Sequence, residues 1–454
     1  MKENRYNTKT EKQLATGKIS TLFRKFAIPS VIGLLFLGLQ TIIDGIILGN
    51  VVGANALASV SLILPCYTLL SSIGVVIGVG CQTFVSVRLG QKNYQGANNA
   101  LTSGFLFLIA FSITVSILLY VFAPEIAVLL GANHILLADS VNYTHALAPF
   151  FPIISLMFFT DYILKATGRP IYAVTIMSSA VLTNIVLDII FVKYLEMGTT
   201  GAGLATGISF SIGALFSVPK IITKRNKITV LSGRYERNLV YKMFYNGSSE
   251  GLSELSSGIT ILLFNITTMR YLGENGVAAF TAINYVLFIG ITISLGIADG
   301  TIPIISYNFG AKNWDRIKKV LKLAVKTVSI IGIIIFTTLS LFGEEVISLF
   351  FKSEETTVIK IAVTGTGIYA FAFLLNGLNI LASSYFTALT NAKISIIISS
   401  LRGLIFIVIG IFIYPRIWGI NGIWFTVPIA ELCTFIVSFI LVKKSLKNKT
   451  SIHE

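Results

Sequence analysis

Long apolar runs separated by short polar segments are the feature of this sequence that most restricts its fold. A helix of about 20 apolar residues crosses the roughly 30 Å hydrocarbon core of a bilayer, and the sequence contains twelve such runs. Only 12% of the residues are charged, about half the share that is typical of soluble domains. We therefore expect an all-α integral membrane protein. The twelve predicted spans are 26–49, 57–87, 99–122, 140–163, 171–192, 202–222, 240–269, 277–306, 320–342, 358–388, 394–414 and 420–442.

The chain also repeats itself with an offset of 220 residues. VGANALASVSL from Val52 aligns with LGENGVAAFTA from Leu272, and RLGQKNYQGANNAL from Arg88 aligns with NFGAKNWDRIKKVL from Asn308. Two six-helix halves joined by a polar linker are typical of transporters, so we expect two pseudo-symmetric lobes. The predicted division is a cytoplasmic N-terminal segment (1–25), an N-lobe of helices 1–6 (26–222), a basic cytoplasmic linker (223–239), a C-lobe of helices 7–12 (240–442) and a cytoplasmic tail (443–454).

Positive charge predicts the orientation in the membrane. Of the Lys and Arg residues in the polar segments, 28 lie on the side of the two termini and five on the other side. Cytoplasmic loops carry the excess of positive charge, so both termini are predicted to be cytoplasmic, in a multi-pass protein of the bacterial plasma (inner) membrane. The net charge of +15 follows from this topology and gives no reason to expect a nucleic-acid partner. The three cysteines and three scattered histidines have no metal-ligand spacing.

Four polar side chains inside the predicted N-lobe helices form the main candidate site: Asp44, Asn184, Asp188 and Thr206. A carboxylate within a membrane helix costs about 2.5–3.5 kcal/mol on insertion scales, so it usually faces a cavity, a partner or an ion pathway. Asn184 and Asp188 are four residues apart and share a helix face. Asp44, Asp188 and Thr206 each lie roughly 7–9 Å from the predicted outer end of their helix. Such an oxygen-rich pocket suits a hard cation, or a proton held between two carboxyl groups.

The repeat does not duplicate these residues. At an offset of 220 Asp44 aligns with Phe264, and at an offset of 221 Asp188 aligns with Ile409. A requirement of the scaffold would recur in both halves, so we favour a functional role over a structural hydrogen bond between helices.

These features resemble the multidrug and toxic compound extrusion (MATE) family, within a superfamily that also holds lipid-linked oligosaccharide flippases. The resemblance covers the twelve spans, the two halves, the N-x-x-x-D pattern at Asn184 and Asp188, Thr206 eighteen residues later, and Asp44 fifteen residues after Pro29. It implies that these four polar residues bind a proton or a sodium ion and that Pro29 is a site of helix bending. Predicted helix 7, NGSSEGLSELSSG, lacks the family's proline, so no C-lobe site is carried over.

The resemblance further implies a V-shaped pair of lobes and an antiporter, coupled to H⁺ or Na⁺, that exports amphipathic, mostly cationic drugs by alternating access. We expect no cofactor beyond the coupling ion, small-molecule substrates, the lipid bilayer as the other partner, and a monomer. The alternative is a lipid-linked glycan flippase, which would line its cavity with basic groups for a pyrophosphate. Arg402 and Lys326 are nearly the only deep basic residues. A membrane enzyme finds no support, since no nucleophile–base motif or soluble catalytic domain is visible.

Further polar residues are candidates for a substrate cavity: Gln40, Glu250, Glu254 and Glu431. Glu250 and Glu254 share a face of predicted helix 7 among serines and glycines. One interpretation is an ion-paired network in which Glu250 or Asp299 holds Arg402. The other is an acidic cavity for a cationic substrate. We favour the network for Arg402 and Asp299, and the cavity for Glu254.

Overall fold

The computed structural model describes residues 13–224, 226–351 and 356–450. This part of the chain is almost entirely helical and contains no β-strand. Residues 1–12 of the predicted N-terminal segment, Arg225 of the linker, residues 352–355 and the last residues of the tail lie outside the described residues. The prediction of an all-α membrane protein is confirmed.

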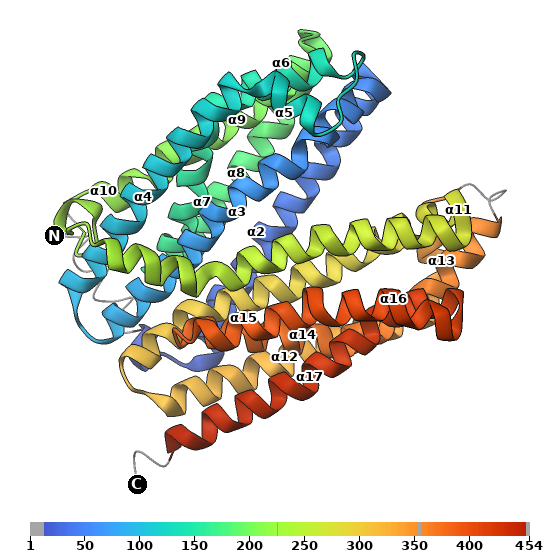
Figure 1. Cartoon of the computed structure of the whole chain (residues 1–454). Coiled ribbons are helices and arrows are strands. Elements are labelled where there is room, and N and C mark those ends of the chain that lie inside the picture. Colours follow the sequence, from blue (N-terminus) through green and yellow to red (C-terminus); the bar gives the residue numbers. More distant parts are fainter. Residues whose placement is uncertain (1–12, 225, 352–355, 451–454) are drawn as a thin grey trace. The chain divides into compact units, whose positions relative to one another are not determined.

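Figure 1 shows the helices in chain order. The first half contains α2 (Ile19–Ile47), η1 (Leu48–Val52), α3 (Ala54–Gly90), α4 (Tyr94–Val121), α5 (Ala123–Leu129), α6 (Leu137–Leu147), η2 (Ala148–Phe150), α7 (Phe151–Ala166), α8 (Pro170–Asp188), η3 (Ile189–Tyr194), α9 (Gly198–Ser217), α10 (Pro219–Ile222) and η4 (Val230–Ser232). The second half contains α11 (Arg237–Gly310), α12 (Trp314–Ser348), α13 (Thr356–Tyr369), η5 (Ala370–Ala372), α14 (Phe373–Ala388), α15 (Ala392–Ser400), η6 (Leu401–Ile405), α16 (Phe406–Trp418) and α17 (Ile420–Thr450).

Within the described ranges, eleven helices are long and apolar enough to cross a membrane. The longest, α11, has 74 residues and changes direction at Gly273, whose φ of 64° and ψ of −155° are not helical. Glycine tolerates this conformation because it has no Cβ. The predicted spans 240–269 and 277–306 therefore lie on the two arms of α11, and the twelve predicted spans are all helical.

Several helices begin earlier than predicted. The spans predicted to start at residues 99 and 320 begin instead at Tyr94 and Trp314. In each case an asparagine caps the helix, because the Asn93 side chain accepts from the backbone N–H of Gly96 (2.8 Å) and Asn313 accepts from that of Arg316 (3.3 Å). Such caps start a helix in polar sequence, where a search for apolar residues does not detect it.

The chain forms two compact units, each with its own apolar core. The first unit is built mainly from Ile32–Gly247, and the second mainly from Ser248–Ile305 and the chain from Lys312 onward. The initial part of α2, Ile19–Val31, belongs to the second unit. The first core packs around Met157, Ala180 and Phe210. The second packs around Phe264, Tyr369 and Trp424.

The predicted basic linker is docked along α4 in the first unit. Asn98 accepts a hydrogen bond from the backbone N–H of Thr229 (2.9 Å) and donates one to the carbonyl of Lys227 (3.2 Å). Thr102 donates to the carbonyl of Val230 (2.7 Å). Side chains of one helix thus satisfy the backbone of a segment with little structure of its own. The described linker residues 226–236 therefore pack as part of this unit.

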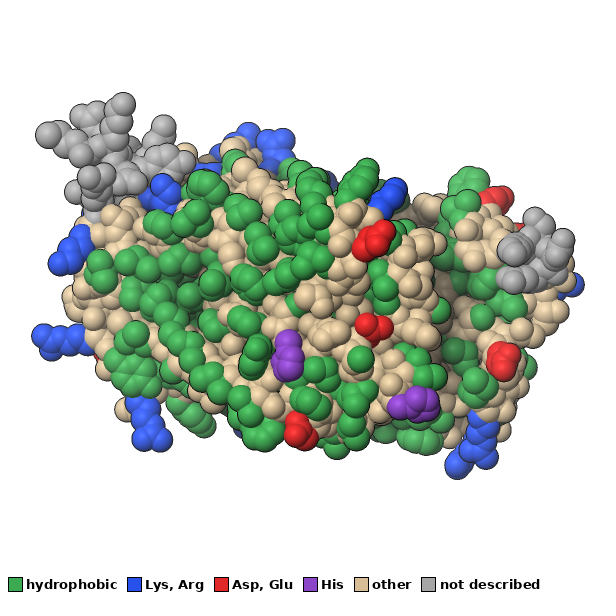
Figure 2. Space-filling view, turned by 90° about the horizontal axis from the view of Figure 1, so that it is seen from above, with side chains coloured by type: hydrophobic (Ala, Val, Ile, Leu, Met, Phe, Trp, Pro, Cys, Tyr) green, Lys and Arg blue, Asp and Glu red, His purple; other side chains and the backbone are tan. Residues whose placement is uncertain are grey.

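The surface is suited to lipid. Many large apolar side chains are exposed, including Ile117, Leu182 and Leu215. Figure 2 shows hydrophobic side chains over much of the visible face, with few charged groups among them. Exposed apolar area of this extent marks a surface that water does not cover, which agrees with the membrane spans.

Candidate cation site

Three helices of the first unit carry the predicted site residues. Asp44 lies near the C-terminal end of α2, Asn184 and Asp188 lie at the end of α8, and Thr206 lies in α9. A side chain at Gly207 would place its Cβ 2.2 Å from a ring carbon of Phe150. Small residues allow membrane helices to approach closely. The absence of a side chain at Gly207 therefore lets α9 pack closely against Phe150, next to Thr206.

The structure brings all four predicted residues together. The carboxyl groups of Asp44 and Asp188 are hydrogen-bonded to each other. The Asn184 amide donates to the Thr206 hydroxyl oxygen at 3.3 Å, and its side chain also acts on the Asp188 carboxyl group one turn later. The other terminal atom of the Asn184 amide lies 3.0 Å from Asp44 Oδ1, where an amide nitrogen would donate to an ionised carboxylate.

Gln40 belongs to the same cluster. It lies one helical turn before Asp44 on α2, and its side chain hydrogen-bonds the Asp44 carboxyl group. Only 6% of Gln40 is exposed. Gln40 was predicted to line a substrate cavity, and it lies beside the Asp44 carboxyl group.

Asp188 is the most enclosed carboxyl group of the cluster. It is 1% exposed, and Asn184 is fully buried. Asp188 Oδ1 receives no hydrogen bond from an N–H or hydroxyl donor in the described part of the chain. A buried carboxylate oxygen without a donor is costly, so this atom is suited to a proton or a small cation.

Two π-helical turns flank the site. η1 (Leu48–Val52) begins four residues after Asp44, and η3 (Ile189–Tyr194) begins directly after Asp188. The two turns contact each other. π-helical turns are rare and often accompany functional sites. No residue pattern in the apolar sequence distinguishes them from α-helix, so the sequence analysis did not predict them.

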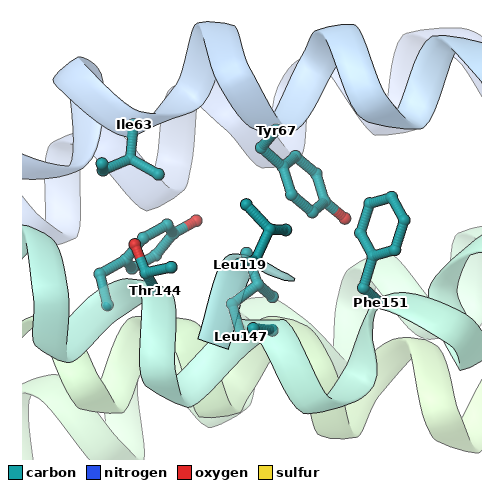
Figure 3. Close-up of a pocket in the computed structure, with 8 residues that line it drawn as sticks. Ile63, Tyr67, Leu119, Thr144, Leu147 and Phe151 are labelled. Carbon is teal, nitrogen blue, oxygen red and sulfur yellow. The ribbon is translucent and has the colours of Figure 1, made fainter. Parts of the chain in front are cut away.

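Sequence reasoning also missed Tyr143 and Tyr67. Tyr143 on α6 lies close enough to Asp44 and Asp188 to interact electrostatically with both carboxyl groups. Tyr67 on α3 is its neighbour. Both tyrosines line a cavity of about 10 Å³, and Figure 3 shows Tyr67 and Phe151 at one end of it. A water molecule needs roughly 10–15 Å³. This cavity is therefore too small for a drug molecule.

Helix α2 continues through Pro29 without interruption. Proline removes one backbone hydrogen bond from the helix interior. The chain passes from the second unit to the first between Val31 and Ile32, close to this residue. The role of Pro29 as a site of helix bending stays a prediction.

In the second unit the counterpart of Asp44 is a packed aromatic residue. Phe264 is fully buried, stacks on Phe280 with ring centroids 4.9 Å apart, and meets Tyr369 edge-on at 5.9 Å. The same position thus supports a carboxylate in one unit and an apolar core in the other. The shared fold does not require the acidic residue.

The acidic residues of the second unit are arranged differently from the prediction. Arg402 was expected to pair with Glu250 or Asp299, but its Nε lies 3.0 Å from Glu431 Oε1. Asn376 and Asn379 each donate to the same carboxylate at 2.7 Å. A carboxylate this deeply buried, only 3% exposed, needs several such partners. Several acidic residues were predicted at depths near that of Arg402, and the sequence does not show which of them faces its guanidinium group.

Glu250 and Glu254 do lie near each other, and the charges of Asp299 and Arg402 also act on Glu250. Glu254 is exposed, whereas Glu250 is partly buried. Among the described residues there is no group of three or more His, Cys, Asp or Glu side chains that could hold a metal ion. In the first unit, carboxyl, amide and hydroxyl oxygens are the groups available to a cation.

The MatE family model matches residues 29–190 and 253–412, which include most of both halves of the chain. The multidrug export protein MepA of Staphylococcus aureus (strain NCTC 8325 / PS 47) is 25% identical over 419 residues, with 92% of each chain covered. The MepA protein of Staphylococcus haemolyticus (strain JCSC1435) is also 25% identical, over 97% of this chain and 98% of the relative.

Solved structures share the fold. A crystal structure of MATE in complex with MaL6 superimposes with a TM-score of 0.91 at 24% identity, covering 97% of this chain and 99% of that chain. The family model matches well over half of the chain. The protein belongs to the MatE family of membrane transporters.

Proposed function

We propose that the protein is a cation-coupled antiporter that exports amphipathic, mostly cationic compounds. The similar MepA proteins are named multidrug export proteins. The observation that carries the coupling proposal is the hydrogen bond between the carboxyl groups of Asp44 and Asp188. A carboxylate only accepts hydrogen bonds, so two carboxyl groups joined in this way hold a proton between them.

In the proposed cycle, gain and loss of this proton changes the hydrogen bonds of Asn184. When Asp44 is ionised, the amide turns its N–H towards Asp44 Oδ1, at 3.0 Å. When the two carboxyl groups share the proton, Asp44 carries less negative charge and holds this N–H less strongly. The changed contact alters how α2 is held against α8. Bending near Pro29, where the helix already lacks a backbone hydrogen bond, is the proposed response.

A sodium ion is the alternative coupling ion. The carboxyl oxygens of Asp44 and Asp188, the Asn184 carbonyl and the Thr206 hydroxyl are the hard ligands that such a cation prefers. We favour the proton, because the carboxyl groups of Asp44 and Asp188 lie within hydrogen-bonding reach of each other and need only share one proton to work. A sodium ion would need the oxygens of Asn184 and Thr206 as ligands, whereas a proton shared by the two carboxyl groups would not. This difference can be tested.

We propose that the carboxyl groups of Glu250 and Glu254 in the second unit attract the positive group of a substrate. The Glu431 carboxylate is less suited, since Arg402 and two asparagines occupy it. A lipid-linked glycan flippase would need basic groups against its pyrophosphate, whereas the deep charged residues are mainly acidic. By the distribution of Lys and Arg, we place both termini in the cytoplasm. We further propose that the protein acts as a monomer in the bacterial plasma membrane.

Ethidium efflux from proteoliposomes tests this function. Vesicles carry the purified protein and receive either a pH gradient without sodium or a sodium gradient at equal pH. We expect the pH gradient to drive efflux and the sodium gradient to leave it at the level of empty vesicles. Efflux driven by sodium alone would replace the proton by sodium. Efflux driven by neither gradient would contradict cation-coupled export.

A further inference from the structure

We propose that a pocket at the bend of α11 in the second unit binds amphipathic organic cations. The positive group would lie at Glu274 and the apolar body along Tyr285 and Phe350. The pocket has a volume of about 460 Å³. Ligand sites for drug-sized molecules usually have volumes of about 300–1,000 Å³, so this pocket can hold such a molecule. Its residues belong to the second unit, and the Asp44 cluster belongs to the first.

The bend at Gly273 builds the pocket. Met269 lies on the arm of α11 before the bend, and Glu274 follows the bend directly. Thr281 and Tyr285 lie one turn apart on a single face of the second arm. Phe350, just after the end of α12, adds a second ring to this wall, because its ring stacks on that of Tyr285 with centroids 6.2 Å apart and planes 6° from parallel.

The lining has the chemistry that recognises an organic cation. Glu274 is exposed and is the charged member of the described lining. It forms no ion pair with another described residue. The faces of Tyr285 and Phe350 attract positive charge through the ring quadrupole. Met269 adds an adaptable apolar contact. One carboxylate within an aromatic and apolar wall favours a monovalent cation with a large apolar body.

The matching region of the first unit lacks this chemistry. Gly53 corresponds to Gly273 and also has a positive φ, of 121°. At the same offset, however, Ala54 stands for Glu274 and Leu130 for Phe350. The fold repeats the bend and does not repeat the carboxylate or the ring. The pocket's composition is therefore not a requirement of the fold.

This inference does not depend on the proposed export function, because binding at the pocket needs no ion gradient. Two sources could supply an apolar body with a positive group: a free organic cation and the ammonium headgroup of a membrane lipid. Both present the same chemistry to Glu274. The experiment separates them through the composition of the bilayer.

Protection of a single thiol reports on this pocket directly. Thr281 is exposed and lines the pocket, so Thr281→Cys is introduced into the full chain after Cys66, Cys81 and Cys433 are replaced by alanine. The protein is placed in nanodiscs of anionic phosphatidylglycerol, and the rate of maleimide labelling is measured. Tetraphenylphosphonium should slow labelling severalfold. Tetraphenylborate, which has the same shape and the opposite charge, should leave the rate unchanged.

Charge variants then test the role of Glu274. Glu274→Gln should raise the half-protecting concentration of tetraphenylphosphonium about threefold to tenfold, the range for one ionic contact beside aromatic rings. Glu345→Gln removes an exposed carboxylate outside the pocket and should change nothing. Asp188→Asn should keep full protection, because the pocket does not use the coupling site. Equal protection by both tetraphenyl ions, or undiminished protection in Glu274→Gln, would overturn the proposal.

Nanodiscs of phosphatidylethanolamine identify the natural source. If lipid ammonium groups occupy the pocket, labelling should already be slow in these discs without added cation, and Glu274→Gln should restore the fast rate. If free organic cations are the ligands, the rate should match that in phosphatidylglycerol until tetraphenylphosphonium is added. Direct binding of radiolabelled tetraphenylphosphonium to the protein with native Thr281 checks that the cysteine itself does not create the site. No difference between the Glu274→Gln protein and its parent in that assay would also count against the pocket.

Discussion

The carboxyl groups of Asp44 on α2 and Asp188 on α8 are hydrogen-bonded to each other inside the first unit. Two ionised carboxylates at this distance would repel each other, and neither could donate. We propose that a shared proton, or a cation bound by both groups, removes this repulsion. In either case the packing of α2 against α8 depends on whether the site holds its ion. This dependence is the basis of the coupling proposed above.

The neutral ligands Asn184 and Thr206 distinguish the two coupling ions. Thr206→Ala and Asn184→Ala each remove an oxygen that a sodium ion would need, whereas a proton shared by two carboxyl groups does not need them. Under proton coupling we expect both variants to keep most of their efflux in sodium-free buffer. Efflux is measured against sodium concentration at fixed pH. A severalfold rise in the half-saturating sodium concentration for either variant would favour sodium.

Glu254→Gln should weaken the binding of cationic drugs more than it weakens ion coupling. Glu254 is an exposed carboxylate next to Glu250, and neutralising it removes attraction for a cation without touching the first unit. Equilibrium binding of ethidium to the purified protein measures the first effect, and proton-driven transport at saturating drug measures the second. Equal losses in both assays would assign Glu254 to the structural network instead.

Arg402 should stabilise the second unit through Glu431. Arg402→Met leaves a buried carboxylate without its charged partner, which typically costs about 3–5 kcal/mol. The double variant Arg402→Met/Glu431→Gln removes both charges and should recover much of this loss. Thermal unfolding of the purified protein measures both, with Arg416→Met at an exposed helix end as the control. A double variant no more stable than the single one would show that the pair does not act as a unit.

The linker should become accessible to protease when its contacts with α4 are removed. Asn98→Ala removes the hydrogen bonds to the backbone of Lys227 and Thr229, and unpaired buried groups cost about 1–3 kcal/mol each. We expect faster trypsin cleavage after the exposed Lys224 and Arg234. Gln91→Ala, in the exposed turn before α4, should cleave at the wild-type rate. An unchanged rate in Asn98→Ala would mean that other contacts hold the linker.

The sequence predicted the fold well because membrane spans have a simple signature. An apolar run long enough to cross the bilayer must satisfy its backbone internally and so forms a helix. The helix ends were less accurate, since Asn93 and Asn313 start helices in polar sequence. The docking of the linker could not be predicted, because it depends on which side chains of α4 face the backbone of residues 226–236.

The residues of the first-unit site could be predicted because carboxylates are rare inside membrane helices. Their spacing and depth placed Asp44, Asp188 and Thr206 at one level, and the structure brings them together. Tyr143 was missed because one tyrosine among seventeen gives no signal. The predicted partner of Arg402 was wrong, because the depth of a residue along its helix does not show which face of the neighbouring helix lies opposite that residue.

Drug efflux by Asp188→Asn tests the central claim most directly. Asparagine has nearly the same shape and its amide can still hydrogen-bond Asp44, but it cannot take up and release a proton at this position. Ethidium efflux driven by a pH gradient is measured in proteoliposomes beside the wild type and Glu125→Gln, an exposed carboxylate outside the site. We predict that Asp188→Asn inserts normally and transports no faster than vesicles without a gradient, while Glu125→Gln transports like the wild type. Gradient-driven efflux near the wild-type rate in a well-folded Asp188→Asn protein would contradict the proposed coupling site.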